Sequence, residues 1–269
     1  MNPWPLDPLD PVFPMSRQIF KTDAVVLRSL AYGESDLIMT FFTSGFGKLK
    51  GIAKGARRSK KRFVNSLDLF SRSDVVFSRK SPDGLALIES CDVREHYPGI
   101  REDLERTLVA SYFIDLVDQF ASEAKRDIEL FHSLNDFLAV LGSGYHSETL
   151  IRVFELRLLR SAGYEPVFDR CIGCKTEIGS ITMPAFSVKE GGIFCERCAP
   201  GKPETVRASC GTFRTLLLGR DMDLPKIRRI VLTGQSEAES RMILVRFIHH
   251  LLGKELKSFR VLNDIRRMG

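Results

Sequence analysis

The spacing of apolar residues changes near residue 97, and this change constrains the fold more than any other feature. Between residues 19 and 93 the chain carries five short runs rich in β-branched residues and leucine, with turn residues between them. From residue 98 onward, apolar residues recur at intervals of three and four, which is the period of an amphipathic helix. Strands in one part and helices in another indicate a multidomain α+β protein rather than alternating βα units.

The first part predicts a small antiparallel β-barrel. No long helix alternates with its strands, so a parallel sheet is not expected. Among five-stranded barrels the OB-fold is common, and its exposed face and loops bind oligonucleotides. We therefore expect an N-terminal OB-fold domain over residues 16–95. Its strands are predicted at residues 23–32, 36–43, 48–55, 74–80 and 85–93, with hairpin-type turns at 44–47 and 81–84.

The second part of the sequence predicts one helical bundle built from two separate stretches of the chain. Three helical patterns precede a loop-like segment and two follow it, and the long apolar stripes can bury one another. Ser147 is a candidate cap, and Ser236 and Glu239 have the spacing of a capping box. We expect one helical domain built from residues 96–165 and 204–269. The helices are predicted at residues 98–120, 127–142, 147–163, 204–219 and 236–253.

Four of the six cysteines lie in the loop-like segment, as two C-x2-C pairs that twenty residues separate: Cys171, Cys174, Cys195 and Cys198. Each pair can bring two thiolates to one ion, and two pairs complete a tetrahedron. Two disulfides or a redox pair are the alternatives, but a disulfide within C-x2-C closes a very small loop and stabilises little. We predict a structural zinc module over residues 166–203. Four thiolates fill the coordination sphere, so the metal has no open position for catalysis.

Positive charge is concentrated in one short segment. The chain has a net charge of +6 and a pI near 9.0, which favours a negative partner: nucleic acid, an anionic membrane or an acidic protein. Eight of the fifteen residues from 48 to 62 are basic and none is acidic. A solvated loop is one reading, but mutual repulsion favours an anion at this place. We predict nucleic-acid binding by Lys48, Lys50, Lys54, Arg57, Arg58, Lys60, Lys61 and Arg62.

Aromatic residues near this segment could stack on bases, as rings do in OB-folds that bind single strands. Phe46 at the glycine turn and Phe63 beside the basic run are the candidates, but for any single ring a place in the core or as a loop anchor is the safer expectation. Phe41 and Phe42 point to opposite faces of a strand, so we expect one in the core and the other exposed.

Several classes of protein are not expected. No run approaches the roughly 18 apolar residues of a membrane span. The first fourteen residues hold five prolines and acidic residues, unlike a secretory leader, so residues 1–15 are predicted to be a disordered extension, with Met15 an alternative start. A cytoplasmic location follows. The sequence lacks a phosphate loop, an H-E-x-x-H motif and a deaminase motif, so we expect no enzyme.

Three stretches of the sequence resemble the bacterial RecO family of recombination mediators. They are SRQIFKTDAVVLRSLAYGESDLIMTFFTSGFGKLKGIAKGARRSKKRF (16–63), FELRLLRSAGYEP (154–166) and the pair CIGC and CERC. The likeness runs from about residue 16 to the end, and the proline-rich first fourteen residues depart from it. The resemblance implies an OB domain, a helical domain and a four-cysteine zinc module whose ligands are Cys171, Cys174, Cys195 and Cys198.

The resemblance also implies a function in DNA repair by homologous recombination, in the cytoplasm and associated with the nucleoid. Such proteins bind single- and double-stranded DNA, anneal complementary strands and, with RecR, help load RecA onto DNA coated by single-strand binding protein. DNA binding carries over onto residues 48–62 as a region. The acidic tail of single-strand binding protein would suit a basic and apolar groove in the helical domain, with Arg228, Arg229, Arg241 and Arg246 as contributors.

Two other functions stay open from the sequence. A zinc-stabilised RNA-binding or transcription-associated factor would prefer RNA or one base sequence. A hydrolase with dispersed catalytic residues would turn over a substrate and lose activity on single substitutions.

Overall fold

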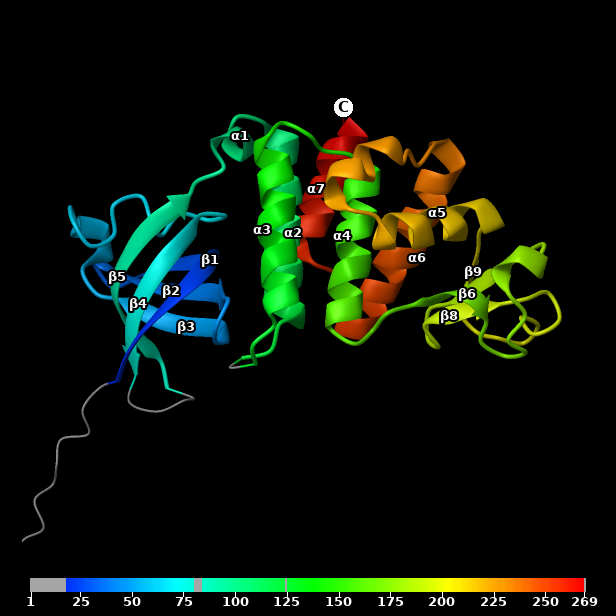
Figure 1. Ribbon diagram of the computed structural model, residues 1–269, viewed down its shortest axis with the longest axis horizontal. Coiled ribbons are helices and arrows are strands. Elements are labelled where there is room, and N and C mark those ends of the chain that lie inside the picture. The colour runs from blue at the N-terminus through cyan, green and yellow to red at the C-terminus, as the bar shows by residue number, and fades with distance from the viewer. Residues whose placement is uncertain (1–17, 80–83, 124, 269) are drawn as a thin grey trace, which may run out of the picture.

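A computed structural model of the chain describes residues 18–79, 84–123 and 125–268. The predicted extension at residues 1–15 and most of the predicted turn at 81–84 lie outside these residues. A β-barrel stands at one end of an elongated molecule, helices form the middle, and a small sheet lies at the other end (Figure 1). The multidomain α+β architecture is therefore confirmed.

The barrel closes in the order β1-β2-β3-β5-β4, which makes it OB-like. Antiparallel pairs join its strands, except that β3 and β5 run parallel where the barrel closes. Gly51 lies at this closure, and a β-carbon there would come 2.5 Å from a side-chain carbon of Ile88, so glycine lets β5 approach. The strands are β1 (Gln18–Tyr32), β2 (Asp36–Thr43), β3 (Gly47–Ala53), β4 (Arg72–Arg79) and β5 (Ala86–Glu95).

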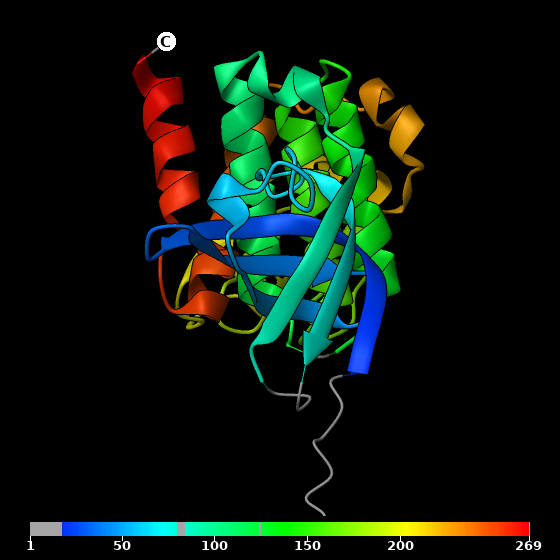
Figure 2. The same ribbon diagram turned by 90° about the vertical axis from the view of Figure 1, so that its left-hand side faces the viewer.

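The helices stand behind the barrel in Figure 2 and form one bundle. Asp103, Asp127 and Ser147 cap three of them, because each side chain accepts a hydrogen bond from the backbone N–H three residues on. None of the helices in the described ranges is long and apolar enough to cross a membrane. They are α1 (Pro98–Arg101), α2 (Leu104–Phe120), α3 (Ile128–Gly142), α4 (Glu148–Ser161), α5 (Cys210–Asp221), α6 (Gly234–Leu252) and α7 (Lys257–Met268), with a 3-10 helix η3 (Leu224–Arg229) between α5 and α6.

The small sheet packs onto the bundle rather than standing apart. Its strand order is β6-β8-β7-β9, and the core that begins in the barrel continues through the helices into it. The ring of Phe168 contacts that of Phe213 on α5, and the ring of Phe186 contacts that of Phe247 on α6. The elements are β6 (Val167–Cys171), the 3-10 helix η2 (Ile178–Ser180), β7 (Ala185–Ser187), β8 (Gly192–Phe194) and β9 (Thr205–Arg207).

Three predicted helices differ from those observed. The helix predicted from residue 204 begins only at Cys210, because Thr205–Arg207 pair with β7 as a strand and Ser209 caps α5. The helix predicted from residue 98 is divided in two, since Asp103 caps a new helix. Ser236 does not cap α6, and Glu239 instead accepts hydrogen bonds from α5 at Ser209 and Thr212. Helix α7 was not predicted.

The barrel and the bundle share a packed interface. Phe42 on β2 and Phe131 on α3 are both fully buried, with ring centroids 6.1 Å apart. The expectation that either Phe41 or Phe42 is exposed was therefore wrong: Phe41 fills the barrel, and Phe42 fills the junction with the helices. Gly47 has φ 64° and lies against residue 125 so closely that a β-carbon would overlap the carbonyl of Lys125. The barrel therefore packs closely against the bundle at Phe42 and Gly47.

Phe131→Ala is predicted to lower the free energy of unfolding by about 3–5 kcal/mol, because it removes a fully buried ring from the interface. Urea denaturation followed by circular dichroism measures the change. Asp136→Asn, at an exposed position of the same helix, is the control and should change the value by less than about 0.5 kcal/mol. A loss below about 1 kcal/mol for Phe131→Ala would contradict a tightly packed junction.

Candidate nucleic-acid interface and metal centre

The predicted basic segment divides between two environments. Lys48 and Lys50 lie on β3 and face the helical bundle, whereas the other six cations lie at or beyond the end of this strand. The 3-10 helix η1 (Ala56–Arg58) and the chain after it carry most of those six.

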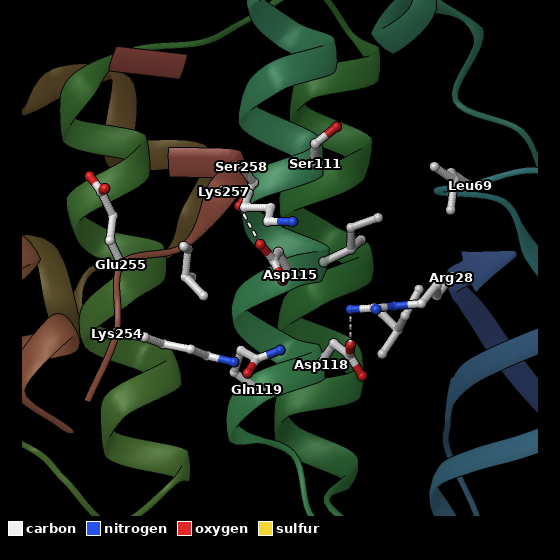
Figure 3. A pocket seen from close by; sticks show the side chains of 13 residues that line it. Arg28, Leu69, Ser111, Asp115, Asp118, Gln119, Lys254, Glu255, Lys257 and Ser258 are labelled. Atoms are coloured by element: carbon white, nitrogen blue, oxygen red, sulfur yellow. Dashed lines mark hydrogen bonds and ion pairs between the residues drawn. The ribbon is translucent and has the colours of Figure 1, made fainter. Parts of the chain in front are cut away.

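Carboxylates of the helical region form ion pairs with the cations on β3. The ammonium group of Lys48 donates to the backbone carbonyl of Asp118 at 2.5 Å and lies 3.5 Å from its carboxylate. Lys50 lies 2.5 Å from the carboxylate of Glu123, and this hydrogen bond lowers the pKa of Glu123. Arg28 on β1 reaches the same Asp118 at 2.7 Å across a pocket of about 450 Å³ (Figure 3). The segment itself has no acidic residue, but the helical region supplies acidic partners to Lys48 and Lys50.

The other six cations project from the end of the barrel. We call Lys54, Arg57, Arg58, Lys60, Lys61 and Arg62 the basic loop; all six are exposed. Among the described residues, only Arg58 of this loop has a carboxylate partner, Glu34, at 3.3 Å. Both side chains of that pair are largely exposed, so it stabilises the fold little.

Backbone hydrogen bonds and the side chain of Arg62 hold the basic loop in shape. The backbone N–H of Arg57 donates to Ser35, and that of Gly55 donates to the carboxylate of Asp36, both next to the β1–β2 turn. The guanidinium of Arg62 donates to the carbonyl of Lys54 at 2.9 Å and lies 5.0 Å from the centre of the Phe63 ring. The arrangement presents a concentrated positive charge to solvent.

The rings predicted to stack on bases are not free to do so. Phe63 is 5% exposed and belongs to the barrel core, so the expectation of a core ring holds for Phe63 and stacking is excluded there. Phe46 is partly buried against Phe20 and Phe77. Tyr32, at the β1–β2 turn that holds η1, is 56% exposed and is a better stacking candidate. In the sequence, Tyr32 ends a predicted strand immediately before Gly33, and this position could have indicated an exposed ring.

The four predicted metal ligands come together. The sulfur atoms of Cys171, Cys174, Cys195 and Cys198 all lie within 4.8 Å of one another, and no two are joined in a disulfide. Tetrahedral coordination with metal–sulfur bonds of about 2.3 Å requires sulfur atoms roughly 3.8 Å apart, so the cluster fits one metal ion. Each C-x2-C pair is a tight turn: Lys175 N–H donates to the carbonyl of Cys171 at 2.9 Å, and Cys198 N–H donates to that of Cys195 at 3.0 Å.

The electrostatics of the cluster favour a bound cation. A hydrogen bond with the Thr176 hydroxyl, together with backbone and thiol contacts, lowers the pKa of Cys174 to about 6, so this group is a thiolate at neutral pH. Hydrogen bonds with Cys174 and Cys195 raise the pKa of Cys198 to about 12. Four thiols this close cannot all ionise unless a positive ion balances them.

The two remaining cysteines do not join the cluster. Cys91 is in the barrel core, and burial raises the pKa of its thiol to about 11. Cys210 is partly buried at the start of α5, where its thiol donates to the carbonyl of Ile181.

The four arginines predicted to bind an acidic tail lie in different environments. Arg228 lines a pocket of about 570 Å³, and its guanidinium lies 4.7 Å from the centre of the Tyr145 ring. Arg241 is partly buried and is paired with Glu148 and Glu237. Arg229 and Arg246 are exposed.

Comparison with protein families identifies the chain. Residues 15–97 match the family described as recombination protein O N terminal, and residues 101–260 match recombination protein O C terminal. The chain belongs to the RecO family. The two matches meet near residue 100, where the barrel gives way to the helices.

Individual RecO proteins are similar over nearly their whole length. A DNA repair protein RecO of Syntrophus aciditrophicus is 48% identical over 256 residues, which cover 94% of this chain and 99% of that protein. Those of Halalkalibacterium halodurans and an Anaeromyxobacter species are 30% and 34% identical, over 93% and 91% of this chain and 96% of each relative. The resemblance drawn from sequence motifs to the RecO family is therefore confirmed.

Cys174→Ser is predicted to abolish stoichiometric metal binding, because a hydroxyl is a poor ligand for a thiolate site. Elemental analysis should find about one metal ion per chain in the wild type and less than about a tenth in the variant. Cys210→Ser is the matched control and should retain its metal, because Cys210 is not in the cluster. Equal metal content in all three proteins would contradict the assignment of these ligands.

Proposed function

We propose that this chain is a recombination mediator in DNA repair. It binds single- and double-stranded DNA, anneals complementary strands and, with RecR, helps load RecA onto DNA coated by single-strand binding protein. The observation that carries the proposal is the basic loop, six exposed cations at the end of an OB-like barrel in a RecO family chain. The site of action would be the nucleoid in the cytoplasm.

Such a function needs no covalent chemistry, and we propose that the chain is not an enzyme. Two DNA strands repel each other through their phosphates, and a positive surface that contacts both lowers this repulsion. Base pairing then supplies the free energy for annealing. Single strands can also stack on Tyr32 beside the loop.

The basic loop, rather than the whole basic segment, is the proposed DNA contact. Lys48 and Lys50 are engaged by Asp118 and Glu123, and phosphate would have to displace these carboxylates. The six loop cations face no such competition apart from the exposed Glu34. We therefore assign Lys48 and Lys50 to the junction and the loop to DNA.

The metal in the cysteine cluster is proposed to be zinc with a structural function. Thiolates prefer soft or borderline ions, and a closed set of four thiolates is typical of structural zinc. Cys171 and Cys195 are buried where the sheet meets the bundle core, so the ion would stabilise this end of the molecule. We propose residues 166–203 as the zinc module, 16–95 as the DNA-binding domain, and the remaining segments, 96–165 and 204–269, as one helical domain.

The pocket beside Arg228 is the proposed site for the acidic tail of single-strand binding protein. Its apolar lining comes from Ala139, Val140, Tyr145, Leu224 and Pro225, and its charged residues are Arg228 and Asp136. An acidic peptide with an apolar end can place that end in the pocket and a carboxylate against the guanidinium. Of the four arginines predicted from the sequence to bind the tail, the proposal retains Arg228.

The annealing function is tested by changing Arg57, Arg58, Lys60, Lys61 and Arg62 to alanine. This variant should anneal complementary oligonucleotides far more slowly than the wild type, with folding checked by circular dichroism. If five phosphates are contacted, the slope of log K against log salt concentration for single strands should be near −3.5 in the wild type, and it should approach zero in the variant.

The control is Lys48→Gln with Lys50→Gln, which removes two cations that carboxylates already neutralise. It should keep the salt dependence of the wild type. Equal annealing by the wild type and the five-alanine variant would place the DNA contact elsewhere. Failure of the wild type to anneal DNA, with tight binding of RNA instead, would overturn the proposal in favour of an RNA-binding factor.

The tail site is tested by two substitutions of opposite effect. Arg228→Ala should weaken binding of a synthetic acidic tail peptide by roughly tenfold, because it removes a charge-assisted contact. Asp136→Asn should strengthen it, because it removes a like charge from the same pocket. Fluorescence anisotropy of the labelled peptide measures both, and unchanged affinity in Arg228→Ala would contradict the site.

A further inference from the structure

Four aliphatic side chains form a row across the outer face of the barrel. Leu30 on β1 pairs with Ile38 on β2, Ile38 pairs with Ile52 on β3, and Ile52 pairs with Leu87 on β5. Side chains alternate between faces along a strand, and the neighbours of these residues, such as Met39 and Ala53, point into the barrel core. All four therefore point outward, and we call them the aliphatic row.

The aliphatic row is not part of any core in the described structure. Leu30 is 52% exposed, and Ile38, Ile52 and Leu87 are partly exposed and belong to neither hydrophobic cluster found among the described residues. Outward-facing residues nearer the bundle are covered instead, because Phe42 packs against Phe131 on α3. A contiguous apolar strip that reaches solvent is typical of a protein–protein interface.

The two flanks of the aliphatic row differ in charge. On the side toward the bundle lie Arg28 and Lys50, which Asp118 and Glu123 neutralise. On the other side lie Tyr32 and Lys54, and beyond them the basic loop, which the β1–β2 turn holds in place. A partner that covers the row would therefore meet one edge whose cations are paired with carboxylates and one strongly positive edge.

We propose that the aliphatic row is a docking surface for an amphipathic helix of a partner protein, with carboxylates along one edge. Four neighbouring strands about 4.8 Å apart give a row roughly 14 Å long. A helix rises about 1.5 Å per residue, so roughly ten residues, or three turns, span the row. Apolar side chains every three or four residues would lie on the row, and the carboxylates would face the basic loop.

Other occupants fit the surface less well. A second copy of this chain also has a net charge of +6, so its approach to the basic loop would bring like charges together. Nucleic acid binds open barrel faces by stacking on rings, and the row has four aliphatic side chains and none that is aromatic. The inference goes beyond DNA binding, because it assigns the sheet face to a protein partner whose carboxylates lie at the edge of the basic loop.

The test uses the full chain and a fluorescein-labelled helical peptide of about 14 residues, with leucine at every third or fourth position and glutamate along one edge. Fluorescence anisotropy should show binding to the wild type. Leu30→Ser with Ile52→Ser should weaken it by roughly tenfold or more. Val231→Ser is the control, since Val231 is 70% exposed but lies in the helical domain, and it should bind as the wild type does.

Further measurements distinguish the aliphatic row from the proposed tail pocket and from the DNA-binding loop. Arg228→Ala, in the proposed tail pocket, should leave binding of this peptide unchanged, and DNA annealing by Leu30→Ser with Ile52→Ser should persist. A peptide of the same composition with scrambled leucines should not bind. Equal binding of the scrambled peptide, or equal binding by the row variant, would overturn the proposal. So would a dimer that the row variant abolishes, or protection of the row from hydrogen exchange by an oligonucleotide alone.

Discussion

The contact between the barrel and helices α2 and α3 determines what the rest of the molecule can do. Asp118 holds both Arg28 and Lys48, and the ring of Phe42 is buried against that of Phe131. Ion pairs alone would stabilise this junction little, but here they rim a buried aromatic contact. The junction covers one part of the outer barrel face and leaves the basic loop and the aliphatic row exposed. The division of the basic segment follows from this one interface.

The end of the molecule opposite the barrel is defined by packing and metal ligands rather than by exposed charge. Phe168 and Phe186 join the four-cysteine module to α5 and α6, so the metal ligands stand on the same continuous core as the helices. A metal that closes two C-x2-C turns stabilises a sheet whose strands β7, β8 and β9 have three residues each. Stability at this end and charge at the other are separate properties of one chain.

Sequence patterns predicted the elements whose signals are local. The period change at residue 97, the glycine turn at 44–47 and the cysteine spacing each specified structure without reference to distant residues. Patterns failed where tertiary contacts decide. The sequence did not show where Phe42 and Phe63 pack: Phe42 fills the domain junction, and Phe63 fills the barrel. Lys48 and Lys50 look free until Asp118 and Glu123, some seventy residues away, are brought beside them.

The division of the basic segment is tested most directly by chemical footprinting of lysines. The full chain would be acetylated with and without a single-stranded oligonucleotide, and modification at each lysine read by mass spectrometry. DNA should protect Lys54, Lys60 and Lys61, while Lys50, which is 53% exposed but paired with Glu123, should react equally in both samples. Protection of Lys50 to the same degree as the loop lysines would show that the basic segment is not divided in this way.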